Sequence, residues 1–161
     1  KMPFVIKWPG TIKPGSRNRT HLIQNLDYAE TFLDIAGAPV PADMQGKSLV
    51  PLLKGEKPAQ WRKSIYYHYY EYPSVHMVPR HYGVRTATHK LIRFYQFDEW
   101  EFYDLQNDPD ELVNQYNNPA YEAKIAELKR ELNRLREDYD DDSDVAVQSK
   151  QWQQQMRQRT P

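Results

Sequence analysis

The sequence predicts the last part of an α/β domain, an α/β remnant, followed by a small α+β subdomain in which a long helix packs on a four-stranded antiparallel sheet. Three features indicate this fold class. The chain opens on an apolar segment that stops at Pro9-Gly10. Four short segments rich in aromatic and β-branched residues follow between residues 64 and 105. After residue 118, apolar residues recur at helical spacing.

Composition excludes several classes of protein. The 161 residues include 22 basic and 22 acidic side chains, so no net charge favours nucleic acid or an anionic membrane as a partner. The chain has no cysteine, which excludes disulfides, thiolate zinc sites and a cysteine nucleophile. No run approaches the roughly 18 apolar residues of a membrane span. We therefore expect no nucleic acid partner and no membrane span.

The first part is assigned to residues 1–60. Residues 4–8 have the content of a buried strand, and a start inside a strand suggests that preceding sequence is missing. A helix is predicted from Asp27, because Asp27 and Glu30 match a capping box and Gly37 can form a left-handed exit. Asp27 is expected to be this helix cap and not a metal ligand. Residues 38–60 are proline-rich and irregular, with a helical turn expected at 48–53.

The second part is assigned to residues 61–139 and contains the predicted sheet. The four expected strands are residues 64–72, 83–86, 90–95 and 100–105. Short connections favour antiparallel pairing. The tyrosines of residues 66–72 are expected to bury alternate rings, with a sugar-stacking platform as the alternative. Arg85 and Lys90 are expected to be structural charges on the sheet.

Asn118-Pro119 predicts the start of a helix about five turns long. Its apolar stripe comprises Tyr121, Ile125, Leu128, Leu132, Leu135 and Tyr139. A helix on one face of the sheet is favoured over a coiled coil, which would need a longer seam and a partner. Asp140-Asp141 is interpreted as part of a solvated acidic run, and residues 140–161 as a disordered acidic and glutamine-rich tail.

Five local patterns, in this order, resemble the C-terminal third of the formylglycine-dependent (type I) sulfatases. They are residues 2–10 (MPFVIKWPG), 25–37 (NLDYAETFLDIAG), 44–53 (MQGKSLVPLL), 82–92 (YGVRTATHKLI) and 102–114 (FYDLQNDPDELVN). Glu30 stands where proline is usual in that family. The likeness covers about residues 1–140 and is greatest to bacterial sulfatases that act on sulfated glycans, including the glucosamine-6-sulfatase type.

The resemblance implies an alkaline-phosphatase-like sulfatase body, a sulfate-ester hydrolase activity and a sulfated carbohydrate substrate. It also implies a formylglycine made from Cys or Ser and a calcium ion. No serine here begins the activation motif, and the chain has no Asp-Asn dipeptide. We therefore expect no catalytic residue, metal ligand or cofactor in this chain. Calcium and formylglycine are expected in a missing N-terminal sulfatase domain, and this chain alone is predicted to be inactive. The resemblance also implies a periplasmic or secreted full-length enzyme.

Residues 72–82 form the candidate substrate-contacting segment. His76, Arg80 and His81 are the candidates, because histidine and arginine donate to sugar hydroxyls and anions. The alternative is that they are surface loop residues without a ligand. A zinc site built from the histidines at 68, 76, 81 and 89 is not expected, because nothing in the spacing places them on one face.

Two other functional classes compete with the partial hydrolase. In one, the sheet and its aromatic loop are a stand-alone module that recognises an anionic glycan. In the other, the long helix pairs with a partner, and the chain is a structural or interaction domain.

Overall fold

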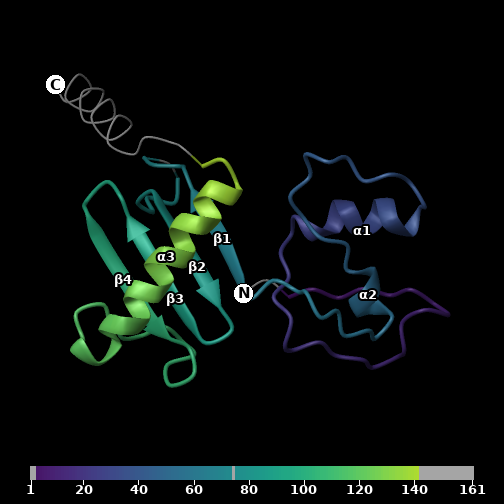
Figure 1. Cartoon of the computed structure of the whole chain (residues 1–161), viewed down its shortest axis with the longest axis horizontal. Coiled ribbons are helices and arrows are strands. Elements are labelled where there is room, and N and C mark those ends of the chain that lie inside the picture. Colours follow the sequence, from purple (N-terminus) through teal and green to yellow (C-terminus); the bar gives the residue numbers. More distant parts are fainter. Residues whose placement is uncertain (1–2, 74, 142–161) are drawn as a thin grey trace. The chain divides into compact units, whose positions relative to one another are not determined.

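The computed structural model describes residues 3–73 and 75–141, which divide into two compact units. The first ends at Lys63 and the second begins at Ser64 (Figure 1). The predicted tail from residue 142 onward lies outside the described residues. No helix among the described residues has both the length and the apolar character needed to cross a membrane.

The first unit consists of two short helices, α1 (Asp27–Ile35) and α2 (Val50–Leu53), joined by irregular segments. Gly37 has φ +66°, which confirms the predicted left-handed exit after α1. The predicted strand at residues 4–8 is wrong, because this segment belongs to neither a helix nor a strand. A strand requires a hydrogen-bonded neighbour, and no described segment pairs with residues 4–8.

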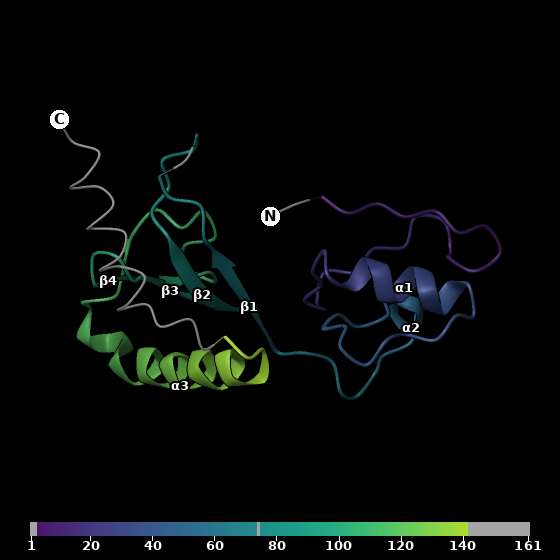
Figure 2. The ribbon, with the colours of Figure 1, turned by 90° about the horizontal axis from the view of Figure 1, so that it is seen from above.

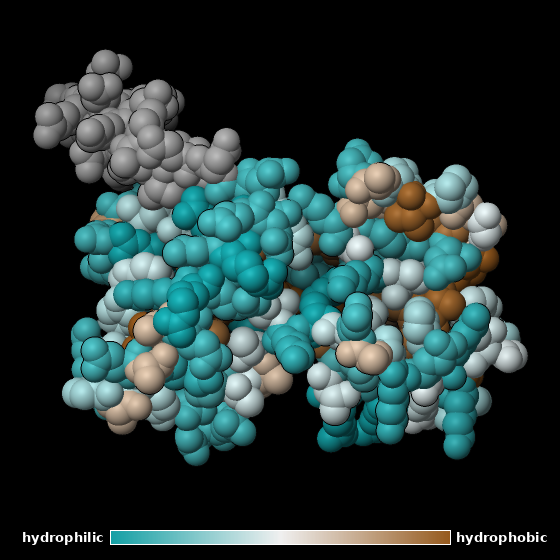
Figure 3. All heavy atoms as spheres, viewed as in Figure 1, coloured by the Kyte–Doolittle hydropathy of each residue, from teal (hydrophilic) through white to brown (hydrophobic). Residues whose placement is uncertain are grey.

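Helix α1 buries its polar side chains. Asp27, Glu30 and Thr31 are all at most 3% exposed, whereas Phe32 is 65% exposed. Figure 3 shows hydrophobic side chains gathered at the surface of this unit. The apolar side chains of α1, such as Phe32 and Ile35, therefore lie on its exposed face in the described part of the chain.

The buried polar side chains of α1 accept hydrogen bonds from distant backbone amides. Lys47 N–H donates to Asp27 Oδ1 over 2.9 Å, and Gly46 N–H donates to Glu30 Oε1 over 2.5 Å. Arg62 adds a bidentate ion pair to the Asp27 carboxylate, with N–O distances of 2.5 and 2.6 Å. The predicted capping box is therefore wrong: Leu26 is the N-cap residue, and Glu30 binds the 46–49 segment instead of reaching back.

The second unit is an antiparallel sheet with strand order β1-β2-β3-β4. The strands are β1 (Ser64–Tyr69), β2 (His81–Thr86), β3 (His89–Phe94) and β4 (Glu99–Asp104). The four predicted strands are confirmed. A 3-10 turn (Pro119–Tyr121) then leads into helix α3 (Glu122–Asp138), which lies along one face of the sheet (Figure 2).

The core of this unit lies between α3 and the sheet. Val84, Leu91 and Phe102 are fully buried on the helix-facing side of three adjacent strands. The helix contributes Ile125, Leu128, Leu132 and Leu135, each at most 7% exposed. The predicted stripe and its packing on the sheet are therefore confirmed. Asn118 is also confirmed as a cap, because its Oδ1 accepts from Ala120 N–H at 3.0 Å.

The other face of the sheet combines aromatic rings with paired charges. Glu111 bridges Arg85 and Lys90, with N–O distances of 3.3 and 2.5 Å, which confirms that both bases are structural. Tyr67 lies over Gly83, where an added Cβ would come within 2.6 Å of the phenol oxygen. The tyrosines of β1 alternate between the two faces, but all three are half-buried, so the predicted burial of alternate rings is not confirmed.

Candidate functional site

The connection between β1 and β2 carries the three predicted substrate-contacting residues. His76 lies in a turn, is exposed, and makes no hydrogen bond or ring contact with the residues that the structure describes. Arg80 and His81 lie at the other end of the connection, where β2 begins. The segment therefore places one candidate in open solvent and two at the sheet.

His81 is held by packing on the sheet face that points away from α3. Its ring stacks on Tyr69 with centroids 5.4 Å apart and tilts against Phe94 at 5.2 Å. Its Nδ1 lies 2.8 Å from the carbonyl oxygen of Pro79, which is therefore the acceptor for an Nδ1–H proton. This leaves Nε2 as the nitrogen of His81 that can contact a ligand.

Arg80 directly precedes β2, so the alternation of the strand directs it to the opposite face from His81. Its backbone N–H donates to Gln96 Oε1 over 3.0 Å. Its guanidinium forms no ion pair or hydrogen bond with any described residue, although Nε is completely buried. The amide nitrogen of Gln96 is also buried without an acceptor. The structure thus brings two unsatisfied donors to one end of the sheet but separates Arg80 from His81.

A buried polar cluster that the sequence did not reveal lies beneath the end of α3. His68 Nδ1 lies 3.0 Å from Asp141 Oδ2, and its Nε2 lies 3.1 Å from the Tyr95 hydroxyl. Tyr66 also donates its hydroxyl proton to Asp141. Asp141 is therefore not part of a solvated acidic run, and that interpretation is wrong, because the end of α3 folds this carboxylate back over β1. Alternation along β1, which puts residues 66 and 68 on one face, was the available signal.

Burial dominates the electrostatics of this cluster. It lowers the pKa of His68, although the hydrogen bond to Asp141 acts in the opposite direction. Burial and the hydrogen bond to Asp141 both raise the pKa of Tyr66. His68 is therefore neutral near pH 7, donating through Nδ1 and accepting at Nε2 from Tyr95. Because both ring nitrogens already have partners, the cluster fastens the end of α3 to the sheet and leaves no free base.

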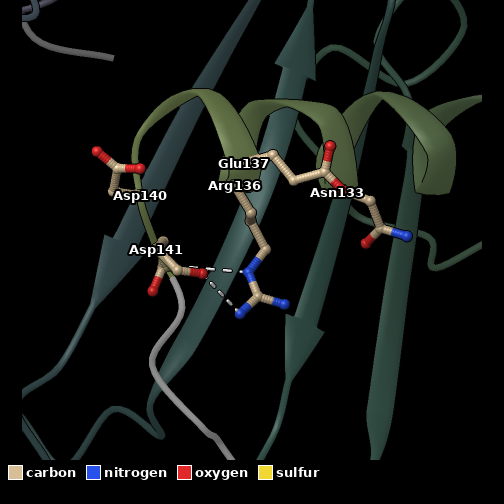
Figure 4. A pocket seen from close by; sticks show the side chains of 5 residues that line it. All are labelled: Asn133, Arg136, Glu137, Asp140 and Asp141. Atoms are coloured by element: carbon tan, nitrogen blue, oxygen red, sulfur yellow. Dashed lines mark hydrogen bonds and ion pairs between the residues drawn. The ribbon is translucent and has the colours of Figure 1, made fainter.

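A depression on the surface at the C-terminal end of α3 is lined by polar residues, of which Arg136 and Asp141 pair with each other. Figure 4 shows Arg136 extending toward Asp141, with Asn133, Glu137 and Asp140 around them. Arg136 Nη2 donates to the backbone oxygen of Asp141 over 3.1 Å, and its guanidinium also lies 4.7 Å from the Tyr82 ring centroid. The arginine is already neutralised and packed, so this depression offers no reactive group.

The described residues do not fit a metal centre, because they contain no group of three or more histidine, aspartate or glutamate side chains that could hold an ion. His68 and His89 lie on the helix-facing side of the sheet, whereas His81 lies on the other side. Asp27 is occupied by Arg62 and by backbone amides.

Comparison with known proteins identifies the family. The model of the family "N-sulphoglucosamine sulphohydrolase, C-terminal" matches residues 1–138. The chain belongs to this sulfatase family. It is 49% identical over 144 residues to the N-acetylglucosamine-6-O-sulfatase of Bacteroides thetaiotaomicron, covering 88% of this chain and 26% of that protein.

Solved sulfatase structures share the fold of this sulfatase C-terminal region. One, a complex with its substrate D-glucosamine-2-N,6-O-disulfate, is 49% identical with a TM-score of 0.71, over 74% of this chain and 25% of that chain. Another, of a 2-O GAG sulfatase, is 31% identical with a TM-score of 0.65, over 72% of this chain and 25% of that chain. The chain therefore spans about a quarter of the length of the sulfatases it matches.

Proposed function

We propose that this chain is the C-terminal region of an enzyme that hydrolyses sulfate esters on sulfated glycans, with a sulfated glucosamine as the substrate unit. The observation that carries the proposal is the 49% identity over 144 residues to an N-acetylglucosamine-6-O-sulfatase. The likeness to a structure holding D-glucosamine-2-N,6-O-disulfate supports the same substrate class.

In this proposal the chain supplies scaffold and pocket wall, and the first unit completes an alkaline-phosphatase-like α/β body. Formylglycine and calcium belong to the rest of the enzyme, since the chain has no cysteine and its described residues offer no metal-binding group. The chain is inactive alone for the same reason. A sulfated carbohydrate and the N-terminal sulfatase domain are its partners.

His76, Arg80 and His81 are proposed to contact the substrate in the full-length enzyme. His76 is exposed on the connection between β1 and β2, and Arg80 carries a guanidinium without a counter-ion among the described residues. His81 offers its Nε2 from the sheet face. Donors of these types suit the oxygens of a sulfate or a sugar ring.

A chimaera tests the proposal. Residues 1–141 would replace the matching segment of the Bacteroides N-acetylglucosamine-6-O-sulfatase, and sulfate release from N-acetylglucosamine 6-sulfate would be measured by ion chromatography. We expect release by the chimaera and none by the 161-residue chain alone. A chimaera that folds by circular dichroism but releases no sulfate would contradict the substrate class. Release by the isolated chain would contradict its assignment as a non-catalytic region.

The same chimaera tests the three contacts. His76→Ala should raise KM by about tenfold with little change in kcat, because it removes a contact made in both ground and transition states. Arg130→Gln, on the exposed side of α3, is the matched control and should leave KM unchanged. An unchanged KM in the His76, Arg80→Gln and His81→Asn variants would remove this segment from the site.

A further inference from the structure

The end of the sheet at Arg80 contains two buried nitrogen atoms that lack acceptors among the described residues, although both side chains are half-buried as a whole. Arg80 Nε and Gln96 Nε2 are both buried atoms with no hydrogen-bond partner in the part of the chain that the structure describes. Leaving a buried donor without an acceptor is unfavourable. Among the described residues no carboxylate forms an ion pair with Arg80, so these donors are available to an oxygen acceptor of a bound molecule.

The strand register and one hydrogen bond bring the Gln96 side chain to the backbone of Arg80. Tyr69 pairs with His81 at the end of the β1–β2 ladder, so Tyr70 and Arg80 are the next residues on their chains. Gln96 follows β3 by two residues, and its Oε1 accepts from Arg80 N–H at 3.0 Å. This hydrogen bond fixes the orientation of the amide, because Oε1 must face Arg80 N–H and Nε2 is then the free donor.

An aromatic ring lies at the same end of the sheet. Tyr70 stacks on His68 with centroids 3.7 Å apart, yet the residue is 55% exposed. His68 in turn contacts the Tyr95 hydroxyl, and Tyr95 directly precedes Gln96. One face of the Tyr70 ring is therefore held by His68, while the residue as a whole remains accessible. An accessible aromatic ring suits the apolar face of a sugar, and unsatisfied cationic and amide donors suit its charged substituent.

We propose that Arg80 and Gln96 form an anion subsite that binds a sulfate group of the glycan, with Tyr70 contacting the sugar that carries it. The proposal deepens the function given above and rests on it for the class of ligand. Arg80 donates through its guanidinium and Gln96 donates through Nε2. The hydrogen bond from Arg80 N–H to Gln96 Oε1 holds the Gln96 side chain beside Arg80. The subsite binds without reacting, because neither side chain is a nucleophile or a base at neutral pH.

Binding is tested on the whole chain by NMR, following the Arg80 Nε–H and Gln96 side-chain amide signals. The ligands are N-acetylglucosamine 6-sulfate, unsulfated N-acetylglucosamine and inorganic sulfate. We expect saturable shifts of both signals with the sulfated sugar and none with the neutral sugar. Weaker shifts with inorganic sulfate would support the anion contact, and equal shifts would remove Tyr70 from the subsite. No shift with any ligand, or equal shifts with both sugars, would overturn the proposal.

Two variants test the donors of the subsite, and one of them also has an expected effect on stability. Arg80→Gln should weaken binding of the sulfated sugar by about tenfold or more, since it removes the charge-assisted donor. Gln96→Glu keeps the acceptor for Arg80 N–H but replaces the free donor with a carboxylate that neutralises Arg80. It should therefore abolish binding and raise the melting temperature. A Gln96→Glu variant that binds like the parent would contradict the subsite.

The matched control is Arg130→Gln, which removes one exposed arginine from α3 and should leave affinity unchanged. Because these titrations measure binding without turnover, they stay separate from the sulfate-release test. A chimaera that hydrolyses N-acetylglucosamine 6-sulfate, combined with a chain that shows no shift at Arg80, would reject the subsite and retain the proposed function. Binding by the chain with an inactive chimaera would do the reverse.

Discussion

Asp104 joins the end of β4 to the turn that precedes α3. Its Oδ1 accepts from the backbone N–H groups of Gln106 and Asn107, at 3.0 and 3.3 Å. Its Oδ2 accepts from the Asn107 side chain at 2.8 Å and from the Tyr121 hydroxyl at 2.9 Å. Burial alone would raise the pKa of this carboxyl, but these hydrogen bonds outweigh it and lower the pKa to about 2.

The depressed pKa of Asp104 predicts an acid-sensitive contribution to stability. A carboxyl whose pKa is lower in the folded state stabilises the fold above its unfolded pKa of about 4, and this contribution is lost as pH falls through the folded value. Asp104→Asn should therefore destabilise the chain most at pH 7, with the difference from the parent shrinking between about pH 4 and about pH 2. Urea unfolding at each pH measures it. Exposed Asp110→Asn is the control, and a pH-independent difference would contradict the prediction.

Glycine is required at position 46 because the Glu30 carboxylate lies too close for a side chain, and not because of the backbone conformation. An added Cβ would lie 2.3–2.4 Å from the Glu30 carboxylate, which accepts from Gly46 N–H. Gly46→Ala should displace this carboxylate and cost about 1–3 kcal/mol, the usual loss for a buried group left without its partner. Hydrogen exchange at the amides of Lys47 and Leu49, which α1 protects, measures the change.

A double-mutant cycle separates crowding from other effects of Gly46→Ala. With Glu30→Ala present, the carboxylate is gone and the added methyl group has room. The Gly46→Ala penalty should then largely disappear. An equal penalty in both backgrounds would show that the contact with Glu30 is not its cause.

At the scale of elements, α3 and the sheet depend on each other. The helix contributes four buried aliphatic residues, and the sheet supplies three fully buried ones against them. Together with Tyr82 and Tyr95, these residues form one buried cluster, to which both the helix and the sheet contribute. This dependence explains why one helix on a four-stranded sheet is sufficient for a core. The helix therefore has no need of a coiled-coil partner.

Shortening a buried side chain in the middle of α3 tests this dependence. Leu132 is 1% exposed, so Leu132→Ala should lower the free energy of unfolding by about 2–5 kcal/mol through lost burial and a cavity. Arg130→Ala, two residues away on the exposed face, should change it by less than about 0.5 kcal/mol. Denaturant unfolding followed by far-UV circular dichroism gives both values. Helicity of the parent that rose with protein concentration would favour a pairing helix instead.

At the scale of the whole molecule, the two units are built on different principles. The second has a continuous hydrophobic core between sheet and helix. In the first, buried carboxylates of α1 collect backbone amides and Arg62, while apolar residues such as Phe32 and Val40 remain at the surface. The matched sulfatases are about four times as long as this segment. These features support the proposed role of the chain as scaffold and pocket wall.

The sequence by itself determined the family, the four strands and the helix on the sheet. These depend on local periodicity and on short motifs, which a single chain carries whatever surrounds it. Three predictions were wrong: the strand at residues 4–8, the capping box and a solvated Asp141. Each of these features depends on contacts with residues distant in sequence. Only the tertiary structure paired Asp27 with Arg62, separated Arg80 from His81, and left Arg80 Nε and Gln96 Nε2 without acceptors among the described residues. Long-range contacts decide which polar groups are satisfied, and no local pattern encodes them.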